Sequence, residues 1–187
     1  MVSILDLWLP ILLSAVFVFV LSSIIHMMLK YHANDFKAIP NEDKVMDALR
    51  PFNIPPGDYW FPRPANMADC KSPDYVKKIT EGPVAMITVC ENGPMKMGGS
   101  LAQWFIYSII VSMFAAYIAG RAIPMGGSYL EVFRFAGATA FVGYALALMQ
   151  NSIWYKRPWS VTLKSMFDGL LYGLVTAGTF GWLWPGI

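Results

Sequence analysis

Residues 7–29, LWLPILLSAVFVFVLSSIIHMML, run for 23 residues without an Asp, Glu, Lys or Arg. An α-helix rises about 1.5 Å per residue, so about 20 apolar residues are enough to cross the ~30 Å hydrocarbon core of a bilayer. The stretch is longer than the apolar part of a cleaved signal peptide. No basic residue precedes it, and no small-residue cleavage site follows it. We therefore predict a retained transmembrane helix.

Three further uncharged stretches of similar length follow, at residues 97–120, 135–155 and 169–187. The composition agrees with a membrane protein, since 56% of the residues are hydrophobic and 14% are charged, against about 45–50% and about 25% in soluble domains. The net charge is +2 and no basic tract is present, which argues against a nucleic-acid-binding protein. The sequence thus predicts an all-α membrane protein with four transmembrane helices.

The charged residues are concentrated between the first two uncharged stretches. Eighteen of the 26 lie from Lys30 to Lys96, nine of each sign. This segment has the composition of an ordinary soluble domain, with charges and apolar residues mixed. We therefore predict a first transmembrane helix at 1–29, an α/β loop subdomain outside the membrane at 30–97, and three transmembrane helices at 98–187.

Two short helices are expected in this loop. Asn41 can cap a helix that ends before Pro51, because proline cannot continue a helix. Ser72 followed by Pro73 is a second N-terminal signal, and Gly82 is a typical residue just past a helix end. The sequence thus predicts helical segments shortly before residue 50 and shortly before residue 82.

A β-hairpin is expected after the second loop helix. Residues 84–90 (VAMITVC) are rich in strand formers, and Asn92-Gly93 follows, a dipeptide that favours tight hairpin turns. We predict that residues 84–90 pair with the returning segment 94–97.

Three consecutive aromatic residues, Tyr59, Trp60 and Phe61, lie among prolines in the middle of the loop. Two interpretations remain open. The aromatic rings can rest at the level of the lipid headgroups, where Tyr and Trp are favoured. Alternatively they form a patch that docks a partner protein, and they are our candidate docking residues.

A stripe of small residues marks the last uncharged stretch, where one recurs at every fourth position: Gly169, Gly173, Ala177 and Gly181. Residues four apart share a helix face, and small side chains allow another helix to approach closely. We expect this stripe to pack within the bundle, with a homodimer seam as the alternative.

Ionisable residues near the uncharged stretches form two close pairs in sequence. Glu131 and Arg134 are three residues apart, and Lys164 and Asp168 are four apart. Both spacings place the two side chains on one helix face. We expect each pair to form a local ion pair near a membrane interface.

Few side chains are suited to metal or haem ligation. The chain has two cysteines, Cys70 and Cys90, whose spacing matches no metal or redox motif. Its two histidines, His26 and His32, are six residues apart, which is about 600° around an unbroken helix and places the rings on different faces. We therefore predict no metal site and no cofactor, with a haem or a quinone near His26 as the alternative.

The orientation follows from the basic residues. Four crossings place residues 30–96 and 156–164 on the same side, and the short second segment has three basic residues and no acidic one. The opposite side has only Arg121 and Arg134. Because cytoplasmic loops carry the excess of Lys and Arg, we predict that both termini are outside and that the 30–97 loop is cytoplasmic. A long loop without net charge obeys this rule weakly, so the reverse orientation stays open.

Several segments resemble small bacterial four-helix integral membrane proteins of uncharacterised function. The likeness rests on SSIIHM at the end of the first stretch, DKVMDALRP and GPVAMITV in the loop, and FDGL and TAGTFGWLWP near the C-terminus. It implies a multi-pass protein of the bacterial inner membrane. It transfers no activity and no site residues.

The function expected from these features is non-catalytic. No phosphate-binding glycine loop, Gly-x-Ser-x-Gly elbow or HExxH motif is present. We predict an accessory or scaffold subunit of a larger bacterial, bioenergetic membrane complex, whose partners are the lipid bilayer and other membrane subunits. The alternative is a small transporter or a lipid- or quinone-handling protein with a polar pocket lined by Gln103, Gln150 and Asn151.

Overall fold

The computed structural model describes residues 1–186, and the chain divides into two compact units. The helical unit comprises Met1–Phe36 together with the part of the chain that is described from Lys96 onward. The loop unit is Lys37–Met95. It begins later than the loop expected at residue 30, because residues 30–36 pack with the helices.

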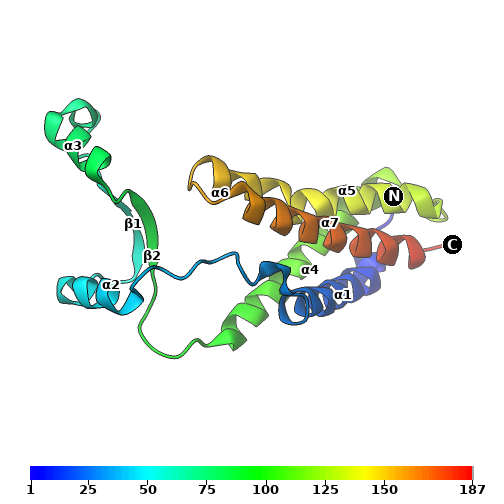
Figure 1. Cartoon of the computed structure of the whole chain (residues 1–187). Coiled ribbons are helices and arrows are strands. Elements are labelled where there is room, and N and C mark those ends of the chain that lie inside the picture. The colour runs from blue at the N-terminus through cyan, green and yellow to red at the C-terminus, as the bar shows by residue number, and fades with distance from the viewer. Residues whose placement is uncertain (187) are drawn as a thin grey trace. The chain divides into compact units, whose positions relative to one another are not determined.

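In the helical unit four long antiparallel helices pack in a ring, each against two neighbours, and a fifth helix is short. Figure 1 shows the long helices running side by side. The helices of this unit are α1 (Trp8–Met27), α4 (Met97–Ala122), α5 (Tyr129–Tyr144), the short α6 (Met149–Ile153) and α7 (Trp159–Trp182). α5 packs on α4 and α7, and α1 packs on the same two helices. Val2 and Pro185 lie at the same end of this unit, where Val2 N donates to Gly120 O at 2.8 Å and Gly126 N donates to Pro185 O at 2.8 Å.

Three helical segments are long and apolar enough to cross a membrane, namely Leu5–Met27, Met97–Ala122 and Tyr129–Ile153. The third begins six residues earlier than residue 135, because Ser128 closes a capping box with Glu131. The Glu131 carboxylate accepts hydrogen bonds from Ser128 N at 3.1 Å and from Ser128 Oγ at 2.9 Å. Among the described residues it forms no ion pair with Arg134, so that expectation was wrong.

The stripe of small residues on α7 lies against α5 of the same chain. A Cβ atom added at Gly169 would lie 2.9 Å from Ala145 Cβ, and one added at Gly181 would lie 2.6 Å from the Tyr129 ring. One added at Gly137 of α5 would lie 2.7 Å from Ala177 Cβ. The two backbones therefore approach as closely as they do because these positions carry almost no side chain.

The outward face of α7 is apolar although the helix contains several polar residues. Its exposed side chains follow a helical spacing at Leu163, Phe167, Leu170 and Leu174. Four of its polar residues are buried inside the bundle: Thr162, Asp168, Thr176 and Thr179. The mean hydropathy of α7 is therefore lowered by groups that lie inside the bundle.

The loop unit contains two short helices, α2 (Glu42–Leu49) and α3 (Pro73–Glu81), close to the expected segments. The start of α3 is as predicted, since Ser72 Oγ accepts a hydrogen bond from Tyr75 N at 3.2 Å. Gly82 follows with φ of 65°, in the left-handed region that favours glycine. Asn41 does not cap α2 through its side chain, because its own backbone is left-handed, with φ of 52°.

The predicted pairing of residues 84–90 with residues 94–97 was wrong. β2 (Ala85–Val89) lies where a strand was expected, but it pairs antiparallel with β1 (Gly57–Phe61) and not with residues 94–97. Pro94 lacks the N–H that a strand ladder needs, and the returning segment is short. The aromatic residues of β1 are strong strand formers and supply a full-length partner.

The three aromatic residues do not share one surface, because side chains alternate across a strand. Trp60 lies opposite Met86, and both side chains are exposed, at 49% and 38%. Tyr59 lies on the other face opposite Ile87, and its hydroxyl donates to Pro55 O at 2.9 Å.

Candidate functional site

Six polar side chains of the helical unit meet at the end of α1 that is joined to the loop unit. We call this group the polar cluster, and it consists of His26, Tyr31, His32, Asp35, Lys164 and Asp168. The first four come from the last turn of α1 and the segment that follows it, and the last two come from the first half of α7.

The two histidine rings lie together because α1 ends between them. The helix stops at Met27, and Leu29 is extended with φ of −88° and ψ of 121°, so the chain reverses before the 3-10 turn Lys30–His32. The ring of His32 then stacks on that of His26, with centroids 4.8 Å apart and planes inclined by 5°. The expectation that the rings lie on different faces was wrong because it assumed an unbroken helix.

His32 is held between two carboxylates. Its Nδ1 lies 2.6 Å from Asp35 Oδ2, and its Nε2 lies 2.7 Å from Asp168 Oδ2. A carboxylate only accepts hydrogen bonds, so each ring nitrogen faces an acceptor to which an N–H can donate. The three side chains are only 13%, 7% and 4% exposed, so these charge-assisted bonds are largely shielded from water.

The Lys164–Asp168 pair expected from the sequence does not form. Both side chains point toward the segment after α1, and each finds its partner there. Lys164 Nζ donates to Asp35 Oδ1 at 2.9 Å and to Tyr31 O at 2.6 Å. Asp168 accepts from His32 through Oδ2 and from the Tyr31 hydroxyl through Oδ1. The four-residue spacing correctly placed Lys164 and Asp168 on one face of α7. Their partners were determined by the segment after α1, which packs against that face.

The surroundings shift the pKa of two groups in the cluster. Burial raises the pKa of the Tyr31 hydroxyl, and the adjacent Asp168 carboxylate raises it further. Burial also raises the pKa of Asp35, but hydrogen bonds from His32 and Lys164 outweigh it and leave the pKa below its ordinary value. At neutral pH Tyr31 is therefore a donor and Asp35 is a charged acceptor.

His26 is exposed, and a local hydrogen bond orients its ring. Its Nδ1 lies 2.9 Å from Ser22 O, an atom that can only accept, so Nδ1 carries the proton. The lone pair is then on Nε2. The hydroxyl of Ser22 has a different partner, because it accepts a hydrogen bond from Trp104 Nε1 at 2.8 Å.

Three residues of the cluster could hold a metal ion together. One ligand atom each from His26, His32 and Asp168 lies within 4.8 Å of the other two. No metal ligands were expected here, because the two histidines were expected to lie on different helix faces and Asp168 was expected to pair with Lys164. A signal was available: four antiparallel helices bring residues 30–36 and 164–168 to the same end of the bundle.

The residues expected to line a polar pocket lie elsewhere. Gln103 and Gln150 are exposed, and Asn151 is partly buried in the middle of α6. The backbone oxygen of Asn151 accepts from Tyr155 N and Arg157 N in the turn before α7. The structure does not bring these three residues into the polar cluster.

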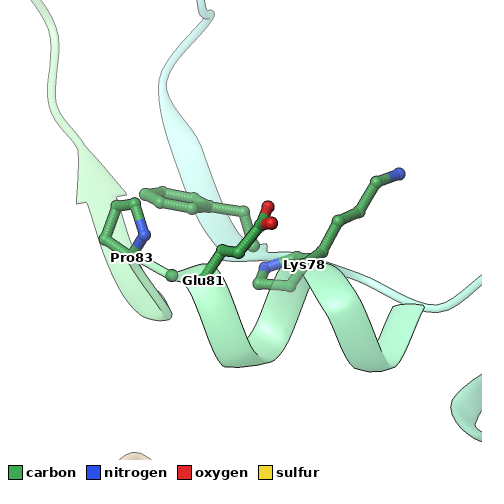
Figure 2. A pocket seen from close by; sticks show the side chains of 6 residues that line it. Lys78, Glu81 and Pro83 are labelled. Carbon is green, nitrogen blue, oxygen red and sulfur yellow. The ribbon is translucent and has the colours of Figure 1, made fainter. Parts of the chain in front are cut away.

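A shallow hollow of about 260 Å³ lies in the loop unit, between the end of β1 and the turn from α3 to β2. Its lining residues are Phe61, Pro62, Lys78, Glu81, Gly82 and Pro83. Figure 2 shows the Lys78 side chain extending away from Glu81 and Pro83. The hollow has no cluster of nucleophilic or metal-ligating groups, and its mixed lining suits contact with another surface.

Comparison of the chain with protein-family models, with curated proteins and with solved structures finds no match. Its function must therefore be inferred from its own side chains.

Proposed function

We propose that the protein is a non-catalytic accessory or scaffold subunit of a bacterial membrane complex, and that its loop unit binds another subunit. One observation carries this proposal. None of the side chains of Lys37–Met95 is buried, although the unit holds many large apolar residues. Those at least one-third exposed include Ile39, Met46, Leu49, Phe52, Trp60, Phe61, Met67, Val76, Ile79, Val84 and Met86.

A unit of this kind lacks the usual source of folding free energy. Small domains depend on a buried apolar core, and a two-stranded sheet is marginally stable in water. Burial of apolar surface contributes about 25 cal/mol per Å², so covering these side chains with a partner would supply the missing stabilisation. Large apolar side chains that stay exposed on a small unit are candidates for an interaction surface.

Another protein fits the loop unit better than an anionic lipid surface. The unit has seven Lys and Arg residues against eight Asp and Glu residues, so it lacks the positive excess that draws a segment to anionic lipids. The sheet consists of β1 and β2 alone, so the outer edge of each strand has no partner strand. A strand of another subunit can pair there through main-chain hydrogen bonds.

The proposal includes α7 as a fourth membrane crossing. Its outward face is lined by leucine and phenylalanine, and four of its polar residues are buried in the bundle. The antiparallel ring supports an even number of crossings, with both termini on one side. Basic residues in the turn before α7 then favour a cytoplasmic loop unit and outside termini in the bacterial inner membrane.

A site-specific photo-crosslinker in place of Trp60 tests the proposed interface in intact membranes. We expect one discrete adduct, and expect Trp60→Asp with Met86→Asp to release the same partner during mild detergent extraction. Met125→Asp is the matched control, because Met125 is 63% exposed but belongs to the helical unit. A monomer by native mass spectrometry, with no adduct at position 60, would contradict the proposal.

A further inference from the structure

We propose that His26, His32 and Asp168 form a binding site for one divalent transition-metal ion, of which Zn²⁺ is the best representative. The ligands are Nε2 of His26, Nε2 of His32 and Oδ2 of Asp168. This inference concerns the helical unit and does not depend on what the loop unit binds.

The donor set selects the class of metal. Two imidazole nitrogens and one carboxylate oxygen suit Zn²⁺ and its first-row neighbours, whereas Mg²⁺ and Ca²⁺ prefer oxygen ligands throughout. Three protein ligands complete a tetrahedral site only with a fourth, exchangeable ligand such as water. The site is therefore of the open kind and could accept a further ligand from outside the chain.

The second nitrogen of each imidazole is already held by an oxygen, and this distinguishes the site from a chance meeting of side chains. His26 Nδ1 donates to Ser22 O at 2.9 Å, and His32 Nδ1 donates to Asp35 Oδ2 at 2.6 Å. Metal-ligating histidines are characteristically oriented by such bonds, which fix the tautomer and make the ligand more basic. Lys164 Nζ in turn holds Asp35 from 2.9 Å.

One carboxylate oxygen of Asp168 would bind the proposed ion, and the other accepts a hydrogen bond from Tyr31. Its Oδ1 accepts from the Tyr31 hydroxyl, while Oδ2 faces His32 Nε2 at 2.7 Å. Binding replaces this hydrogen bond by two bonds to the metal, and the Nε2 proton of His32 passes to solvent. Asp168 is 3% exposed, so the carboxylate is already desolvated and directed before an ion arrives.

Binding requires two changes in the cluster. The rings of His26 and His32 are nearly parallel, so one ring must turn before both Nε2 lone pairs can point to the same ion. Ligand atoms around tetrahedral Zn²⁺ lie about 3.3 Å apart when the bonds are about 2.0–2.1 Å long. The hydrogen bond between His32 and Asp168 must open from 2.7 Å, and the widest pair must close from at most 4.8 Å. His26 is exposed, so its ring can rotate to close that gap and also leaves a route for the ion from the end of α1.

Equilibrium dialysis of the full chain against Zn²⁺ tests the site. The protein must be prepared without a histidine tag, since His26 and His32 are its only histidines. We expect one tightly bound Zn²⁺ per chain and none with Mg²⁺ as the probe. His26→Ala, His32→Ala and Asp168→Asn should each weaken binding by about 100-fold or more, since even outer-shell changes cost 10–100-fold.

Two controls keep the result decisive. Cys70→Ser with Cys90→Ser should leave the stoichiometry unchanged, because both thiols are in the loop unit. With Co²⁺ as the probe, visible d–d absorption without a thiolate charge-transfer band is expected, and His26→Ala should remove it. His26→Ala is the variant least able to disturb folding, because the side chain is exposed.

The proposal is overturned if folded wild-type protein binds no Zn²⁺ in the micromolar range. It is also overturned if His26→Ala binds as well as wild type, or if removal of the cysteines abolishes binding. Thermal unfolding of each variant shows whether the protein compared is folded.

Discussion

Charged side chains are used in opposite ways by the two units. In the loop unit they are plentiful and exposed: Lys77 and Glu81 approach to 3.9 Å, with side chains 71% and 65% exposed. In the helical unit they are rare, yet His32 and Asp168 meet at 2.7 Å with side chains 13% and 4% exposed. Exposed pairs contribute about 0–1 kcal/mol, whereas breaking a buried pair costs about 3–5 kcal/mol. The charge-poor unit therefore has the stronger electrostatic interactions.

Among the substitutions that test this difference between the units, Asp168→Ala is expected to lower the free energy of unfolding most. The substitution leaves the Tyr31 hydroxyl and one face of His32 without an acceptor in a shielded environment. We expect a loss of about 3–5 kcal/mol in the free energy of unfolding, as for other broken buried pairs. Thermal and denaturant unfolding in detergent micelles measure it. A loss below 1 kcal/mol would show that water or lipid headgroups replace the missing carboxylate.

An intermediate effect is expected where α7 meets α5. The new Cβ of Gly169→Ala would lie 2.9 Å from Ala145 Cβ and 3.1 Å from the backbone carbon of Tyr144, so the helices must separate. We expect a destabilisation of about 1–3 kcal/mol by overpacking. Gly178→Ala is the matched control on the same helix, because the nearest atom to its new Cβ lies at 3.7 Å. Equal effects of both variants would argue against close α5–α7 contact.

The smallest effect is expected in the loop unit. Glu81→Gln removes the charge of an exposed i,i+4 pair and should change the free energy of unfolding by no more than about 0.5 kcal/mol. The same unfolding measurement, at low and high salt, checks it. A loss comparable to that of Asp168→Ala would mean that an exposed pair in the loop unit contributes as much stability as a buried pair in the helical unit.

Some of the loop unit was predictable because its signals are local. Ser72 and Pro73 begin α3 through interactions within one turn, and Gly82 follows it for backbone reasons. The partner of β2 was not predictable from such signals. Asn92-Gly93 suggested a turn to residues 94–97, but β1 lies about 30 residues earlier, and Thr88 Oγ1 donates to Asp58 Oδ1 at 2.6 Å across the two strands. Strand pairing depends on which segment offers the better surface, and a turn dipeptide does not report this.

The amino-acid sequence by itself determined which segments are apolar, and three of the helical segments are long and apolar enough to cross a membrane. It did not determine the bounds of α5 and α7, because α5 ends at Tyr144 and α7 begins at Trp159, ten residues before the apolar stretch expected there. It did determine the small-residue stripe from Gly169 to Gly181, since helical periodicity alone places these residues on one face. The polar cluster was decided only by tertiary structure. The end of α1 at Met27 folds His32 back onto His26, and packing of α1 on α7 brings Asp168 to both. Ligand sets of this kind join residues more than 130 positions apart, so no local spacing rule can reveal them.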